Sequence, residues 1–123
     1  MKALMITVFA ILLSTTMAYA SCPKQDGYCY SVEDAIQDNC WRTDGLCYSF
    51  KNAIDLKCSK TDGLCYAITY ALKGKCPIND NGTCHSVNAA LRGKCSYTTP
   101  ICYSLKAAGF DEHFLNRWQQ SHQ

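Results

Sequence analysis

Charge, histidine and long apolar runs are all scarce in this sequence. It has 12 Lys and Arg residues against 10 Asp and Glu, and only three histidines. The net charge is therefore small, and the weak electrostatic field that it produces does not favour nucleic acid or an anionic membrane surface as a partner. His85, His113 and His122 lack the spacing of metal ligands, and no two cysteines have the Cys-x-x-Cys spacing of a zinc site. We therefore expect no bound metal and no cofactor.

Catalytic signatures are missing as well. The sequence has no triad of serine, histidine and aspartate, no paired carboxylates and no phosphate-binding loop. If all cysteines of the mature chain are oxidised, no thiol is left for nucleophilic chemistry. We expect a protein that is not an enzyme.

The one long apolar run lies at the N-terminus. Lys2 precedes an apolar run over residues 3–13, and residues 18–20 read Ala-Tyr-Ala, a small-x-small cleavage site. This pattern is typical of a secretory signal peptide. The run is also shorter than the roughly 20 residues that span a bilayer. We predict cleavage after Ala20 and a secreted or periplasmic chain with no membrane span; a retained anchor is the alternative.

Cysteine, by contrast, is abundant. All ten cysteines follow the predicted cleavage site, whereas Lys2 is lost, so 11 Lys and Arg remain against 10 Asp and Glu. In a small exported domain, this cysteine content is typical of a disulfide scaffold.

The cysteines belong to a repeat of 18 residues. Its clearest copy, residues 43–50 (Thr-Asp-Gly-Leu-Cys-Tyr-Ser-Phe), returns at 61–68 with changes in the last two residues, and more loosely around Cys29, Cys84 and Cys102. The two cysteines of a unit enclose six residues or, in one unit, seven. Ten residues always lie between the second cysteine of one unit and the first cysteine of the next. A loop absorbs an insertion and a helix does not, so the ten-residue segments are predicted to be helices.

The residues of these segments follow a helical pattern. Counted from the helix-start cysteine, the third and seventh positions are apolar, the sixth is alanine, and charged residues lie on the other face. Because eleven residues make about three turns, we expect each helix to reach from one cysteine to the next. Asp-Gly or Asn-Gly before the first four helices supplies a turn and an N-cap.

The expected fold is a small, all-α, disulfide-rich array of about five short helices, stacked as hairpins or a solenoid. We assign 1–20 to the signal peptide, 110–123 to a C-terminal capping helix and tail, and 21–109 to five repeats at about 22–39, 40–57, 58–75, 76–94 and 95–109. Short linkers favour helices that alternate in direction. A stack of parallel helices is the alternative, since seven extended residues reach back about 23 Å.

The C-terminal helix has apolar residues on one side, at Phe110, Phe114, Leu115 and Trp118. We expect it to cover the open end of the stack. The alternative is that it docks onto a partner.

The helices also restrict the disulfide pairing. Cysteines at the two ends of one helix are about 16 Å apart, whereas a disulfide needs Cα atoms within about 7 Å. The preferred scheme closes each linker, through the pairs Cys22–Cys29, Cys40–Cys47, Cys58–Cys65, Cys76–Cys84 and Cys95–Cys102. A rival scheme joins a helix start to the end of the next helix, as in Cys47–Cys76.

Two rows of side chains are candidates for binding. The first follows the helix-start cysteines and comprises Tyr30, Tyr48, Tyr66, His85 and Tyr103. These residues either pack between helices with their hydroxyls in solvent or form a contact surface for a protein or glycan.

The second row lies in the linkers and comprises Lys24, Arg42 and Lys60. It is either ordinary solvated charge or the basic residue that a protease inhibitor presents, although the Asp-Gly turn disfavours an extended inhibitory loop. A third row, Asp26, Asp44, Asp62 and Asp80, is too sparse for calcium, and we expect it to cap helices.

We therefore expect a secreted or periplasmic, disulfide-stabilised helical-repeat protein that is a non-enzymatic binding or effector module. Its partner would be an extracellular or periplasmic protein or a glycan. The alternative is a protease inhibitor or toxin-like ligand that acts through the basic linker residues. A pore-forming or antimicrobial role is weakened by the near-zero charge.

Overall fold

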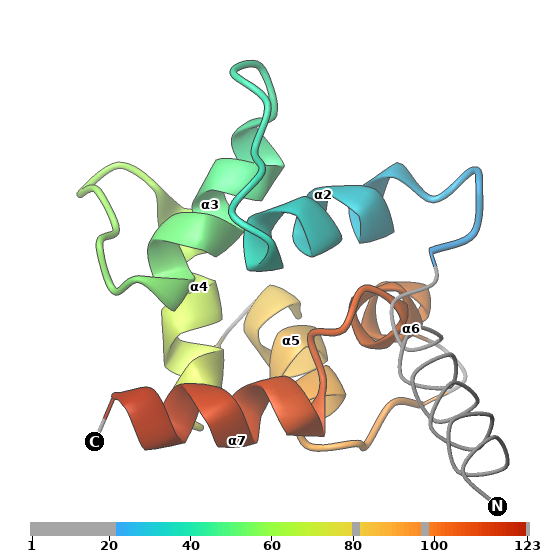
Figure 1. The fold of residues 1–123 in the computed structure, drawn as a ribbon. Helices are drawn as coiled ribbons and strands as arrows, with labels where there is room; N and C mark the ends of the chain where they lie inside the picture. The colour runs from blue at the N-terminus through green and yellow to red at the C-terminus, as the bar shows by residue number, and fades with distance from the viewer. Residues whose placement is uncertain (1–21, 80–81, 97–98, 123) are drawn as a thin grey trace, which may run out of the picture.

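Six helices and no strand make up the described residues of the computed structural model, which are 22–79, 82–96 and 99–122. The helices are α2 (Gly27–Ile36), α3 (Gly45–Ile54), α4 (Gly63–Leu72), α5 (Thr83–Leu91), α6 (Pro100–Ala107) and α7 (Glu112–Ser121) (Figure 1). The prediction of a small all-α, disulfide-rich fold is confirmed, with one helix in each repeat and a further helix after the last. The predicted signal peptide lies outside the described residues.

Three of the repeat helices begin at an aspartate. The side chains of Asp26, Asp44 and Asp62 each accept a hydrogen bond from the backbone N–H of the cysteine three residues on, at 3.0–3.1 Å. This bond satisfies one of the N–H groups that the first turn leaves without an intrahelical partner. The N-cap positions of α5 and α6 hold Gly82 and Thr99, which make no side-chain cap bond.

Each repeat helix ends in a left-handed turn. After α2, the N–H groups of Asp38 and Asn39 donate to the carbonyls of Ala35 and Asp34, which is the Schellman pattern. The same turn has a positive φ at Leu56 and, in the later repeats, at Gly74, Gly93 and Gly109.

This turn corrects the expected helix length. Helix α2 ends at Ile36, and Cys40 lies beyond it in the linker, so the prediction that a helix reaches from one cysteine to the next is wrong. The constant spacing of ten residues contains a shorter helix and the turn that reverses the chain. Both are intolerant of insertions, because the left-handed residue must follow directly on the last helical turn.

Helices α2 and α3 do not form an antiparallel hairpin. Ser31 in α2 donates to Asp44, which caps α3, and the two are 13 residues apart. Asp38, just after α2, pairs with Lys51 in the second half of α3. Partners on both helices thus advance in the same sense along the chain, whereas in an antiparallel hairpin they would advance in opposite senses. The two helices are inclined to each other (Figure 1). These contacts disfavour the hairpin arrangement, and the left-handed turn explains how, because it sends the linker back toward the start of the next helix.

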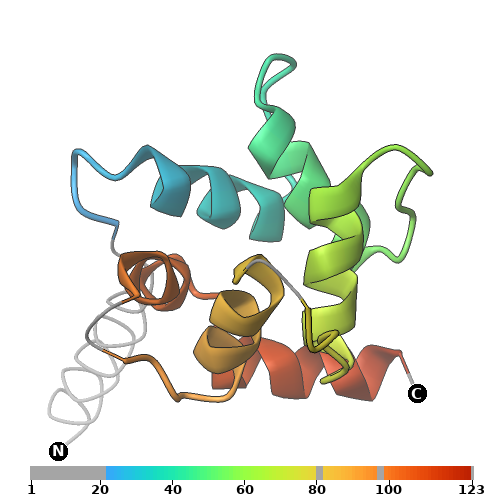
Figure 2. The same cartoon turned by 180° about the vertical axis from the view of Figure 1, so that it is seen from behind.

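The repeat helices close into a ring. Helix α2 packs against both α3 and α6, so the first repeat meets the last (Figures 1 and 2). Ser104 Oγ in α6 donates to the Asp26 carboxylate before α2 at 2.5 Å, although the two residues are 78 positions apart. Among the described helices, the array therefore has no open end of the kind that a solenoid presents.

Every cysteine is disulfide-bonded, and each bond closes one linker. The bonded Cα atoms are 5.6–5.7 Å apart, and the pairs are Cys22–Cys29, Cys40–Cys47, Cys58–Cys65, Cys76–Cys84 and Cys95–Cys102. These are the pairs of the local scheme. Each closes a short loop, for which the chain-entropy model gives a contribution of about 2.5 kcal/mol.

Helix α7 is held on the ring by aromatic side chains. Phe110 is fully buried, and its ring lies 5.4 Å from that of Phe50 in α3 and 4.7 Å from that of Phe114 in α7. The indole N–H of Trp118 donates to the carbonyl of Ile54 at 2.9 Å. The C-terminal helix thus covers the face of the ring at which α3 ends. It was expected to cover the open end of a stack, but the ring has no such end among the described helices.

Candidate functional site

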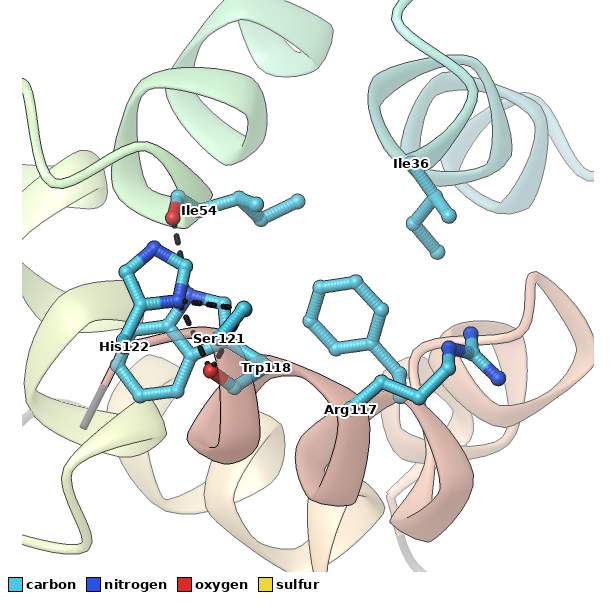
Figure 3. A pocket seen from close by; sticks show the side chains of 7 residues that line it. Ile36, Ile54, Arg117, Trp118, Ser121 and His122 are labelled. Carbon is cyan, nitrogen blue, oxygen red and sulfur yellow. Dashed lines mark hydrogen bonds between the residues drawn. The ribbon is translucent and has the colours of Figure 1, made fainter.

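A pocket of about 250 Å³ lies between the ends of α2 and α3 and the side of α7 (Figure 3). Its apolar wall consists of Ile36 and Ile54, the last residues of α2 and α3, together with Phe114 and Trp118 from α7. Polar atoms enter the lining from Arg117, Ser121 and His122. The pocket therefore combines an apolar interior with a polar border, as small-molecule sites do.

The two isoleucines mark where the ring is incompletely covered. The same position of the repeat holds Leu72 in α4 and Leu91 in α5, and both leucines are fully buried. Ile36 and Ile54 are only partly buried. The pocket is thus a part of the ring surface that α7 leaves open to solvent.

The Ile54 end of the pocket is ordered by contacts within α7. The Trp118 and His122 rings stack at 4.6 Å, with 22° between their planes. His122 Nδ1 lies 2.8 Å from the Trp118 carbonyl oxygen, and Ser121 Oγ donates to the same oxygen at 3.1 Å. Because the Trp118 indole is also bonded to Ile54, this end is a rigid wall.

Arg117 is the lining residue with a permanent charge, and it lies at the opposite end, near Ile36 (Figure 3). Among the described residues, no carboxylate lies within salt-bridge distance of its guanidinium. A guanidinium without a carboxylate retains its five donors for an anion.

A smaller hollow of about 150 Å³ lies on the other side of the two isoleucines. Its Lys51 pairs with Asp38 at 3.0 Å and with Asp55 at 3.2 Å. Hydrogen bonds to Asp38 and then to Asp55 raise the pKa of Lys51 above its ordinary value. This cation is therefore already neutralised by its neighbours, unlike Arg117.

The predicted aromatic row is partly exposed, and its tyrosines bend toward their own linkers. The Tyr30 hydroxyl donates to the Cys22 carbonyl at 3.2 Å, and the Tyr48 hydroxyl donates to the Cys40 carbonyl at 3.5 Å. The exposed fractions of Tyr30, Tyr48, Tyr66 and Tyr103 are 37–45%, and His85 is exposed. At Tyr30 and Tyr48 the hydroxyl is thus hydrogen-bonded to the backbone. The expectation that these tyrosines pack between helices had left their hydroxyls in solvent.

The basic linker residues Lys24, Arg42 and Lys60 are all exposed. Each is the second residue of a tight turn, because the N–H groups of Asp26, Asp44 and Asp62 donate to the carbonyls of Pro23, Trp41 and Ser59. A tight turn differs from the extended loop on which inhibitors present a basic side chain, so this geometry disfavours the inhibitor hypothesis.

The aspartates before the helices use both carboxylate oxygens within the protein. In Asp44, Oδ1 accepts from the Cys47 N–H at 3.1 Å and Oδ2 accepts from Ser31 Oγ at 2.8 Å. Asp26 and Asp62 have the same two kinds of bond. Within the described residues, no group of three or more His, Cys, Asp and Glu side chains could hold a metal ion. Asp80 lies outside them.

Two exposed linker residues were missed by the sequence interpretation. Trp41 is 75% exposed, and Ile78 is 100% exposed. The signal for Trp41 was available, since the other repeats have Pro or Ser at its position after the first cysteine of the linker. A single large residue at a position that is otherwise small indicates a role outside the fold.

Comparison of the chain with protein-family models, with curated proteins and with solved structures finds no match. Within the described residues, no helix has the length and apolar character needed to cross a membrane. Function must therefore be inferred from the chain's own surface.

Proposed function

We propose that this chain is a secreted, non-enzymatic protein-binding module that contacts its partner through the turn at Trp41 and Arg42. The observation that carries the proposal is the 75% exposure of the Trp41 side chain. Tryptophan and arginine are the side chains most enriched at binding hot spots, and here they are adjacent on one loop.

The scaffold supports such a role. The Cys40–Cys47 bond closes the loop, and the Asp44 N–H donates to the Trp41 carbonyl at 3.1 Å. A loop held in this way loses little conformational freedom when it binds, so more of its contact energy appears as affinity. Five disulfides also support an oxidising compartment outside the cytosol.

The proposal is tested with Trp41→Ala and with Ile78→Ala as the matched control, because both change a large, exposed linker residue. The oxidised variants are immobilised and exposed to extracellular proteins of the source, and the affinity for each captured protein is then measured by calorimetry. Trp41→Ala is expected to weaken binding at least about tenfold, while Ile78→Ala binds as the unchanged chain does. Equal affinities for the Trp41→Ala variant and the unchanged chain would reject the proposal.

Fluorescence gives a second readout that does not depend on capture. The chain has two tryptophans, so Trp118→Phe leaves Trp41 as the only indole. An exposed indole emits at long wavelength, and burial in an interface shifts its emission to shorter wavelength. No shift upon saturation with the partner would place the contact elsewhere on the surface.

A further inference from the structure

The pocket beneath α7 is separate from the Trp41 turn, and none of its seven lining residues has a part in the proposed protein contact. We propose that it is a binding site for a small carboxylate with an unbranched apolar tail, with the carboxylate on Arg117 and the tail between Ile36, Ile54 and α7.

The size of the pocket selects a short ligand. Its volume of about 250 Å³ is below the roughly 300–1,000 Å³ of sites that enclose drug-sized molecules. The wall toward α2 and α3 consists of two isoleucine side chains, and α7 adds Phe114 and Trp118. A flexible hydrocarbon tail can follow this wall and remove it from water.

The charge of the pocket selects the head group. The lining contains Arg117 and no Asp or Glu side chain. The two carboxylates of the adjacent hollow, Asp38 and Asp55, are both paired with Lys51. A carboxylate is the head group that matches a planar guanidinium, because two parallel N–H groups can donate to its two oxygens. A cationic head group would instead be repelled.

The geometry also orders the ligand. Arg117 lies toward Ile36, whereas Trp118 and His122 lie toward Ile54 (Figure 3). The carboxylate therefore sits at the Ile36 end, and the tail extends toward the indole of Trp118. Since Trp118 contacts the tail, its emission reports occupancy.

The test uses the oxidised chain with Trp41→Phe, so that Trp118 is the only indole, and three probes of equal tail length: octanoate, octan-1-ol and octylamine. Octanoate is expected to change the Trp118 emission at the lowest concentration and octylamine at the highest. In Arg117→Gln, octanoate binding should weaken at least about tenfold, while octan-1-ol binding is unchanged. Arg42→Gln removes a cation from the distant turn and is expected to leave all three affinities unaltered.

Ile36→Phe provides a second, independent variant, because it fills the pocket without changing its charge. It should weaken octanoate and octan-1-ol together. The proposal is overturned if octanoate does not bind up to about 10 mM, if octanoate and octan-1-ol bind equally well, or if Arg117→Gln leaves octanoate binding intact. Trp41→Ala keeps octanoate binding in this proposal, so failure of the protein contact and failure of the pocket are distinguishable.

Discussion

Two kinds of helix interface make up the ring, and they differ in how the start of one helix is joined to its neighbour. In the regular kind, which joins α2 to α3, α3 to α4 and α6 to α2, a serine of one helix donates to the aspartate that caps the other. In the irregular kind, which joins α4 to α5 and α5 to α6, the capping positions hold Gly82 and Thr99, and neither makes a side-chain cap bond.

Between α4 and α5, other contacts join the two helices. Arg92, at the end of α5, donates to the carbonyl of Ala71 at 3.0 Å and to the side chain of Asn88. The helices on either side also bury Leu72 and Leu91 completely, where α2 and α3 have partly exposed isoleucines. The difference teaches that an aspartate at a helix start can join two helices, and that between α4 and α5 apolar burial and one arginine take its place.

The largest effect is expected from Asp44→Ala, which removes both the cap and the bond from Ser31. Loss of a cap and of a charge-assisted hydrogen bond should lower the free energy of unfolding by about 2–3 kcal/mol. Thr99→Ala, in the irregular half, removes a hydroxyl that bonds Ser96 and should cost less than about 1 kcal/mol. Urea denaturation of the oxidised proteins measures both.

A double-mutant cycle sharpens this result. Ser31→Ala alone removes only the bond between the helices, and its effect should vanish in the Asp44→Ala background. If Asp44→Ala and Thr99→Ala cost the same, or if Ser31→Ala is equally harmful in both backgrounds, the division into two kinds of interface is wrong.

A smaller effect is expected from Arg92→Leu at the α4–α5 interface. The substitution leaves the Ala71 carbonyl without its donor, and should cost about 1–2 kcal/mol. Arg42→Leu, which replaces an exposed linker arginine, serves as the control and should change stability by less than about 0.5 kcal/mol. Equal melting temperatures for Arg92→Leu and the unchanged chain would show that burial alone holds this interface.

The turns after α2 and α3 carry backbone strain that the later turns lack, because they place a residue other than glycine at a positive φ. Leu56 has a φ of 59°, whereas the equivalent turn after α4 has Gly74 at 70°. A leucine in this region is strained by about 1–2 kcal/mol, partly offset by the conformational freedom that glycine loses on folding. Leu56→Gly should therefore stabilise the protein by about 0.5–1 kcal/mol.

The reverse change provides the contrast. Gly74→Ala should destabilise the protein, because an added Cβ at this positive φ would lie 2.9 Å from the Arg92 guanidinium. Thermal unfolding of the two variants should thus shift in opposite directions, and a shift in the same direction would contradict this account of the turn.

The smallest effect at neutral pH is expected at Tyr28, which stands where α3 and α4 have Leu46 and Leu64. Burial raises the pKa of Tyr28 from 10.0 to about 12. As the pH rises from 10 toward 12, the unfolded chain ionises first, so the free energy of unfolding falls in this range and is unaffected below it. Tyr28→Phe should remove this part of the alkaline loss, and identical pH profiles for both proteins would refute the assignment.

The sequence predicted the local structure well because the signals for it are local. The helix-start aspartates were predicted as N-caps, and three of them are. The pairs that close the linkers follow from cysteines seven or eight positions apart, which are the bonds in the structure. The predicted helices were too long because the constant spacing of ten residues includes the Schellman turn, and Cys40 lies in the linker beyond that turn.

The candidate site was less predictable. The tyrosine row and the basic linker residues were identified from their positions in the repeat. Equivalent positions in successive repeats lie at equivalent points around the ring, so they do not gather into one site. The pocket was not predicted, since Ile36 and Ile54 occupy an ordinary core position of the repeat. They line a pocket only because α7 covers part of the ring and leaves them partly exposed.

By itself, the sequence determined that this chain forms five short helices, three of them capped by an aspartate, with a disulfide in each linker. These features depend on residues within about one repeat of each other. Only the tertiary structure decided that α2 and α3 are not antiparallel, that α6 closes on α2, and that α7 leaves a pocket. Ring closure depends on a small rotation that accumulates from repeat to repeat, and it is completed by a bond such as that between Ser104 and Asp26, 78 residues apart. No repeat contains the information about whether the last one returns to the first.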